Sequence, residues 1–111
     1  MTIEVLPADS TYQVVKFIGE LDKAGLSEVR SDFDTLLKDF ALKYLLFDFS
    51  KLAFINSEGI GYLIEINSRL SERGASLVVV GPNAHVSDVF EAVGLGQALK
   101  ISKSLNDFLN S

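Results

Sequence analysis

LLFDFSKLAFINSEGIGYLIEINSRL, residues 45–70, joins two different hydrophobic patterns. Its first part carries apolar residues almost in succession and predicts a buried strand that leads into a turn. From Ser57 onward the apolar residues fall at helical spacing and predict an amphipathic helix. Asn56 and Ser57 are good N-cap residues, because either side-chain oxygen can accept a hydrogen bond from the first-turn amides. A serine hydroxyl is therefore expected where a helix begins, at the end of the dipole that favours negative charge.

The helix from Ser57 is expected to carry two lines of apolar residues. The predicted core stripe consists of Ile60, Leu63, Ile64 and Leu70. Tyr62 and Ile66 lie on another line, beside Gly59, and this spacing predicts an outward partner face with an aromatic residue at its centre. The alternative is a wide apolar stripe that buries both side chains in the core.

The rest of the chain alternates between strand and helix patterns. Strands are expected at residues 2–6, 12–18, 43–49, 75–80 and 99–101. Helices are expected at residues 24–40, after the cap residues Asn83 and Ser104, and from Ser57 to Arg73-Gly74. The helix after Asn83 is expected to be buried through Val86, Val89, Phe90 and Val93. This alternation requires crossover connections, so we predict a single α/β domain over residues 1–111, with a mixed sheet of about five strands and about four helices.

Gly19 is expected to end the second strand. Glu20 and Asp22 then fall in the loop before the first helix. The local interpretation of Asp22 is that its carboxylate caps that helix.

Composition excludes several classes of function. The net charge of −5 disfavours a nucleic-acid-binding groove. The absence of cysteine excludes disulfides and thiol catalysis and fits a reducing cytoplasm, and a lone histidine, His85, leaves no conventional zinc site. No signal peptide is recognised, and no apolar run approaches the roughly 20 residues of a membrane span. We expect a cytoplasmic protein that is not an enzyme, uses no cofactor or metal, and binds neither nucleic acid nor membrane.

Two segments resemble a known family. The string DFSKLAFINSEGIGYL is similar to the signature of STAS domains of the bacterial anti-sigma factor antagonist type. In that signature, an acidic-aliphatic-serine segment precedes Asp-Ser-Ser/Thr-Gly-Leu-Gly. Upstream, GELD at residues 19–22 is similar to the Gly-Glu-Leu-Asp of the family. The order and spacing of the two segments fit, so the resemblance covers nearly the whole chain.

The resemblance implies partner switching in transcription regulation. In the family, the unphosphorylated antagonist binds an anti-sigma factor, which is also a serine kinase of the histidine-kinase-like ATPase fold, and so frees the sigma factor. A PP2C-type phosphatase reverses the phosphorylation. The motif identifies Ser57 as the phosphorylated serine and places Asp22 near it. With the helix pattern, the predicted partner-binding residues are Asp22, Asn56, Glu58, Gly59, Tyr62 and Ile66. The domain is expected to be a monomer or a weak dimer.

Two positions depart from the family pattern. Asn56 replaces the aspartate before the serine, and Glu58 replaces the Ser/Thr that follows it. A kinase that recognises the aspartate would phosphorylate Ser57 poorly, and Glu58 places a fixed charge beside it. These departures motivate an alternative function, a non-phosphorylated STAS interaction module or scaffold subunit of a larger assembly. A third hypothesis is a small-molecule or nucleotide binder that uses residues 57–59 as an anion site.

Overall fold

The computed structural model describes all residues, 1–111, as one five-stranded mixed sheet with four α-helices. The elements are β1 (Thr2–Val5), β2 (Tyr12–Leu21), α1 (Lys23–Lys38), β3 (Tyr44–Ile55), α2 (Ser57–Ser71), β4 (Ser76–Val80), α3 (Ala84–Val93), the 3-10 turn η1 (Leu95–Gln97), β5 (Lys100–Ser102) and α4 (Leu105–Leu109). The strands follow the order β1-β2-β3-β4-β5, with β1 antiparallel to β2 and the other pairs parallel. The predicted α/β fold class is confirmed.

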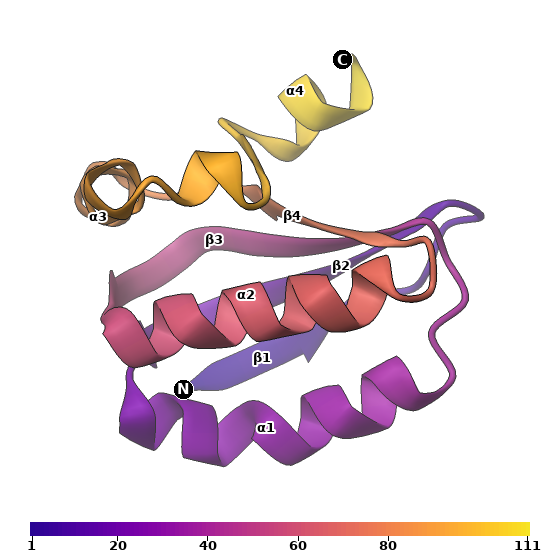
Figure 1. The fold of residues 1–111 in the computed structure, drawn as a ribbon, viewed down its shortest axis with the longest axis horizontal. Coiled ribbons are helices and arrows are strands. Elements are labelled where there is room, and N and C mark those ends of the chain that lie inside the picture. The colour runs from indigo at the N-terminus through magenta and orange to yellow at the C-terminus, as the bar shows by residue number, and fades with distance from the viewer.

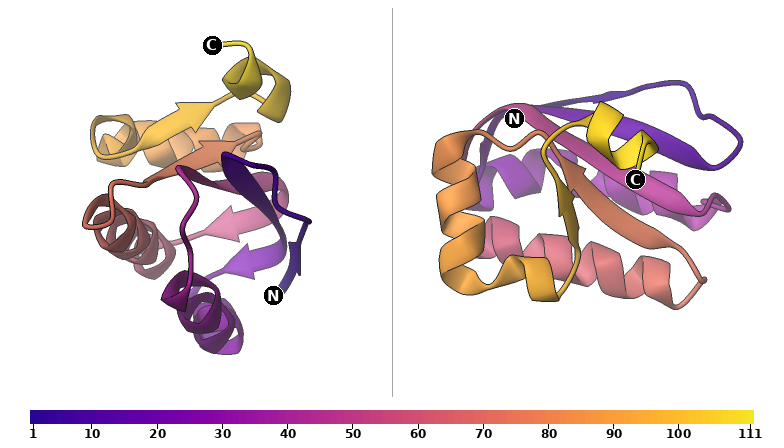
Figure 2. Two further views of the ribbon diagram at one scale, coloured as in Figure 1. Left: turned by 90° about the vertical axis from the view of Figure 1, so that its right-hand side faces the viewer. Right: turned by 90° about the horizontal axis from the view of Figure 1, so that it is seen from above.

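The two faces of the sheet are covered by different helices. α1 and α2 lie side by side against one face, and α4 lies against the other (Figures 1 and 2). The larger core lies under α1 and α2, where the Phe17 ring centroid is 5.5 Å from that of Phe33 and 4.7 Å from that of Phe47. A smaller cluster of Val14, Leu46, Val78 and Val80 packs under α4. The first half of β3 is buried on both faces, so its mostly apolar sequence is that of an inner strand.

β2 and β3 are both longer than their sequence patterns predict. Gly19 does not end β2, since it stays in the ladder with a positive φ of 120°, and Glu20 is a strand residue rather than a loop residue. β3 continues to Ile55 with no turn before α2. The two extended strands pair in parallel to their last residues, with Leu21 opposite Ile55. This pairing places the segments that follow β2 and β3 next to each other at the carboxyl ends of the two strands.

The orientation of α2 differs from the prediction. Tyr62 is 2% exposed and Ile66 is 0% exposed, whereas Ile64, predicted to be in the core, is 44% exposed. The prediction of an outward face at Tyr62 and Ile66 is therefore wrong, and the wide buried stripe is correct. The physical reason is that α2 is covered on two sides, by the sheet and by α1, whose Phe33 ring lies 6.1 Å from that of Tyr62.

The predicted buried stripe of α3 is wrong at one residue. Val86 and Phe90 of α3 are buried as predicted, and the Phe90 ring centroid lies 6.1 Å from that of Phe49 in β3. Val93 was expected on the same stripe but is 56% exposed, because α3 ends there at Gly94. No helix of the chain has the length and apolarity needed to cross a membrane.

Candidate functional site

The N-termini of α1 and α2 lie next to each other at one edge of the sheet. Each helix begins directly after one of two paired parallel strands, and the backbone N–H of Asn56 donates to the carbonyl of Leu21 at 3.3 Å. α3 begins at the same edge, where the side-chain amide of Asn83 donates to the carbonyl of Leu52 at 2.9 Å. This edge therefore collects three helix starts, all of which are positive ends of backbone dipoles.

Asn56, rather than Ser57, caps α2. The Oδ1 atom of Asn56 accepts from the backbone N–H groups of Glu58 at 3.1 Å and Gly59 at 3.2 Å. Ser57 is the first helical residue and is exposed, and its hydroxyl makes no hydrogen bond within the chain. Because Asn56 already accepts from two of the first-turn amides, the Ser57 hydroxyl is not needed as the cap.

Asp22 has the same role at α1 as Asn56 has at α2. Its Oδ1 atom accepts from the backbone N–H of Gly25 at 2.8 Å, so the predicted cap is confirmed. The residue is half-buried, which leaves part of it at the surface beside the α2 start. Asp22 and Asn56 are thus brought together, each following one of the paired strand ends.

Gly59 is a packing glycine. A Cβ atom at this position would lie 2.5 Å from the carbonyl oxygen of Leu21 and 2.7 Å from Cγ1 of Ile55, so only glycine lets α2 approach the sheet this closely. Gly59 is buried and presents no surface to a partner. Gly61, in contrast, is exposed, and a Cβ atom there would meet nothing within 4 Å.

The first turn of α2 is polar and carries one charge. Glu58 is exposed beside Ser57, where the helix dipole stabilises its carboxylate. No cluster of three or more histidine, cysteine, aspartate or glutamate residues in the chain is arranged to hold a metal ion. The site therefore offers an exposed hydroxyl at a helix start with one carboxylate beside it.

One exposed stripe on α2 was not predicted by the sequence pattern. It consists of Ser57, Gly61, Ile64 and Ser68, all exposed and all uncharged, at steps of four, three and four residues. Their helical spacing is visible in the sequence, but spacing alone does not tell which stripe faces solvent. Near the end of β3, Phe54 is 39% exposed, and its ring stacks on that of His85 in α3 at 6.3 Å between centroids. Phe54 lies three residues before Ser57, and His85 lies in the first turn of α3, which begins at the same end of the strands.

Tyr62 belongs instead to the contact between α1 and α2. The Arg30 guanidinium carbon lies 4.7 Å from the Tyr62 ring centroid, and Arg69 Nη1 lies 3.0 Å from an Asp34 carboxylate oxygen in an ion pair between the two helices. The Tyr62 hydroxyl is buried without a hydrogen-bond partner. Burial, together with the Asp34 carboxylate, raises the pKa of Tyr62 to about 12. This contact joins the two helices, and the Tyr62 side chain within it lies outside the exposed stripe of α2.

Comparison with known proteins identifies the same fold in bacterial regulators. The family model described as STAS domain matches residues 3–108. An anti-sigma factor antagonist from Mycobacterium paratuberculosis has a TM-score of 0.83 at 21% identity, over 98% of this chain and 92% of that one. The Bacillus cell fate determinant SpoIIAA in its phosphorylated form has a TM-score of 0.72 at 19% identity, over 98% and 97%. A chain of the stressosome, a signal integration and transduction hub, has a TM-score of 0.69 at 21% identity, over 96% and 93%.

Proposed function

This chain belongs to the STAS domain family, and we propose that it is an anti-sigma factor antagonist whose partner binding is switched by phosphorylation of Ser57. The main support for the proposal is the exposure of the Ser57 hydroxyl and its lack of hydrogen bonds within the chain. Ser57 is the exposed first residue of α2, and Asn56 provides the cap. The similar folds of an anti-sigma factor antagonist and of phosphorylated SpoIIAA support the same function.

A phosphoryl group on Ser57 has opposite consequences inside the domain and at an interface. It adds about −1.5 to −2 charges at neutral pH. Inside the domain, the positive end of the α2 dipole tolerates this charge, and no hydrogen bond of Ser57 has to break. A partner that packs on the same helix end has to desolvate the phosphate, which is unfavourable without a matching cation. Phosphorylation therefore blocks the interface without refolding the domain.

The proposed interface is the exposed stripe Ser57, Gly61, Ile64 and Ser68, flanked by Phe54 and His85. Ile64 replaces Tyr62 and Ile66 as its apolar centre, since both of those side chains are buried. Glu58 lies at its rim, and Asp22 and Asn56 act by holding the helix starts in place. The proposed partners are an anti-sigma factor that is a serine kinase of the histidine-kinase-like ATPase fold, and a PP2C-type phosphatase, all in the cytoplasm.

A second candidate function is a scaffold subunit that is not phosphorylated. Glu58 favours it, because this residue already places a negative charge next to Ser57. The similarity in fold to a stressosome chain agrees with a place in a larger assembly. In this case the same stripe binds a partner, but its affinity does not depend on ATP.

Calorimetric titration with the cognate anti-sigma kinase tests the proposal and separates the two functions. Ile64→Asp is expected to weaken binding at least about tenfold, because it places a charge at the apolar centre of the interface. The matched control is Leu109→Asp, which changes a similarly exposed side chain on α4 and is expected to leave affinity unchanged. Pre-incubation of the chain with kinase and ATP is expected to weaken binding for the wild type and not for Ser57→Ala.

The possible results have different meanings. If Ile64→Asp binds as tightly as the wild type, the proposed interface is wrong. If Ile64→Asp binds weakly but ATP has no effect on the wild type, the chain is a scaffold subunit and the phosphorylation switch is wrong.

A further inference from the structure

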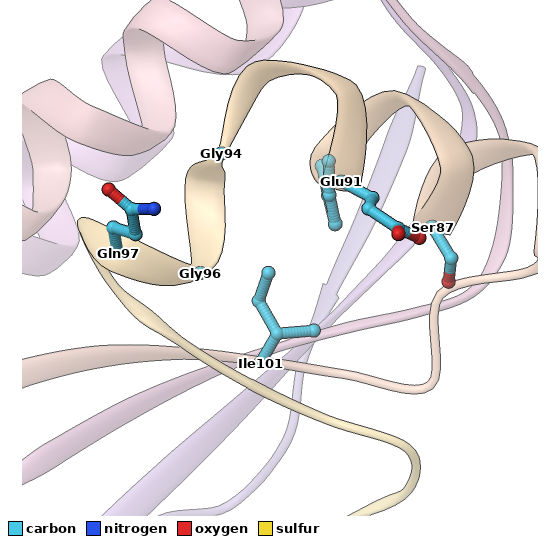
Figure 3. A pocket seen from close by; sticks show the side chains of 7 residues that line it. Ser87, Glu91, Gly94, Gly96, Gln97 and Ile101 are labelled. Carbon is cyan, nitrogen blue, oxygen red and sulfur yellow. The ribbon is translucent and has the colours of Figure 1, made fainter.

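A pocket of about 300 Å³ lies between α3, η1 and β5, separate from the residues of the Ser57 site. Its lining residues are Ser87, Phe90, Glu91, Gly94, Gly96, Gln97 and Ile101. Figure 3 shows Ser87 and Glu91 close together on α3, with Ile101 projecting from β5 toward them. This volume is at the lower end of the range found for ligand-binding pockets, so it suits a small ligand or a single side chain.

The pocket is apolar at its base and kept open by two glycines. Phe90 is 2% exposed and provides the base with the half-buried Ile101. Gly94 ends α3 in the left-handed conformation, with φ of 69°. Gly96 follows with ordinary backbone, and a Cβ atom there would meet nothing within 4 Å. Gly96 lines the pocket without a side chain, so a larger residue at this position is expected to reduce the open space.

The rim of the pocket is negative and has no internal cation. Glu91 is the only ionisable residue of the lining, and the last turn of α3 carries no basic side chain to offset the negative end of its dipole. Lys100 precedes Ile101 in β5, but its ammonium group lies 5.2 Å from the Phe108 ring centroid, over α4, and 3.5 Å from the Ser111 hydroxyl. The pocket therefore combines an apolar base with a single carboxylate at its rim.

We propose that this pocket binds a primary ammonium group carried on a short aliphatic chain. The chain lies against Phe90 and Ile101, and the ammonium group pairs with the Glu91 carboxylate on the Ser87 side of the pocket. The same chemistry is offered by a free alkylamine and by a lysine side chain of another protein. The inference does not depend on the proposed function of Ser57, since the two sites share no residue.

The test is a titration of the isotope-labelled protein with pentylammonium, followed by the backbone amide NMR signals of Gly94, Gly96 and Gln97. These signals are expected to shift in a saturable way with pentylammonium, less with pentanol, and not with pentanoate. A parallel titration with Nα-acetyl-lysine methylamide distinguishes the sources. Tighter binding of this compound identifies a protein lysine as the better occupant, and tighter binding of pentylammonium identifies a free amine.

Two variants test the geometry. Gly96→Leu is expected to fill the pocket and abolish the shifts, whereas Gly61→Leu, which adds the same side chain at an open glycine of α2, is expected to leave them unchanged. Glu91→Gln keeps the size of the side chain and is expected to raise the dissociation constant roughly two- to fivefold, as for an exposed ion pair.

Three results would overturn the proposal. The first is the absence of saturable shifts with either amine. The second is equal shifts with pentanol and pentylammonium, which would remove the role of charge. The third is pentylammonium binding to Gly96→Leu or to Glu91→Gln that is as tight as binding to the wild type. If Gly96→Leu fails to fold, the result for Glu91→Gln still tests the proposal.

Discussion

The first turns of α1 and α2 are built in the same way and expose different groups. In each, an Asp or Asn side chain caps the helix, and a glycine three residues later packs against a carbonyl of β2. The glycines are Gly25, against Glu20, and Gly59, against Leu21. The residues between cap and glycine are Lys23 and Ala24 in α1 and Ser57 and Glu58 in α2.

Comparing the two helix starts shows which of their residues the fold requires. The cap and the glycine occur at both starts, because both helices must leave a strand sharply and lie close to the sheet. A hydroxyl occurs in only one of them. Since α1 begins in the same way without a serine, the fold does not explain Ser57, and its exposed position favours a functional role.

Substitution of the packing glycines is expected to change the free energy of unfolding the most. Gly25→Ala and Gly59→Ala each place a Cβ against the backbone of β2, and each is expected to lower the free energy of unfolding by about 3 kcal/mol. Gly61→Ala, at an open position of α2, is the control and is expected to raise it by up to about 1 kcal/mol. Urea unfolding of the three variants measures these changes. Equal stability of Gly59→Ala and Gly61→Ala would contradict the close contact between α2 and the sheet.

Removal of either cap side chain is expected to lower the free energy of unfolding by a smaller amount, and the two amounts should be similar. Asp22→Ala and Asn56→Ala should each lower the free energy of unfolding by about 1 kcal/mol, because each leaves first-turn amides without an acceptor. Urea unfolding again provides the measurement. If Asn56→Ala is neutral while Asp22→Ala is destabilising, Ser57 has taken over the cap of α2, and its hydroxyl is not free.

Tyr62 tests whether the contact between α1 and α2 is structural. Its pKa is raised from 10.0 to about 12 in the folded protein, so its neutral form is favoured by folding. The contribution of this pKa difference to the free energy of unfolding is fully present below pH 10 and is lost as the pH rises toward 12. Tyr62→Phe removes a buried hydroxyl that has no partner, so at neutral pH we expect no loss of stability, or a gain of up to about 1 kcal/mol.

The measurement is chemical unfolding of both proteins across the alkaline range. The wild type is expected to lose more stability than Tyr62→Phe between pH 10 and pH 12. Identical slopes would show that Tyr62 is accessible to solvent, as an interface residue would be.

The smallest expected effect is that of Ser57→Ala on stability. Because the hydroxyl makes no hydrogen bond within the chain, the free energy of unfolding should change by less than about 0.5 kcal/mol. Thermal or urea unfolding gives this value. A loss of 1 kcal/mol or more would assign Ser57 a structural role and remove the contrast between the two helix starts.

The sequence predicts best those features that depend on local chemistry. The order of strands and helices follows from hydrophobic spacing, and the caps at Asp22, Asn56, Asn83 and Ser104 follow from the ability of short polar side chains to accept first-turn hydrogen bonds. The fold class and the start of α2 at Ser57 are confirmed for the same reason.

Features that depend on distant neighbours were not predicted. Which side of α2 is buried depends on α1, which covers Tyr62 with Arg30 and Phe33, so helical spacing alone placed Ile64 in the core and Tyr62 outside. Gly19 was expected to end β2, but pairing with β3 continues to Leu21. The Phe54–His85 contact joins two elements that the sequence does not place together.

Phosphorylation of Ser57 is detected most directly by the intact mass of the protein after incubation with its cognate anti-sigma kinase and ATP. We expect a gain of one phosphoryl group, roughly 80 Da, in the wild type and no gain in Ser57→Ala. An unchanged mass in the wild type, with a kinase shown to be active, or the same gain in Ser57→Ala, would contradict the proposed phosphorylation of Ser57.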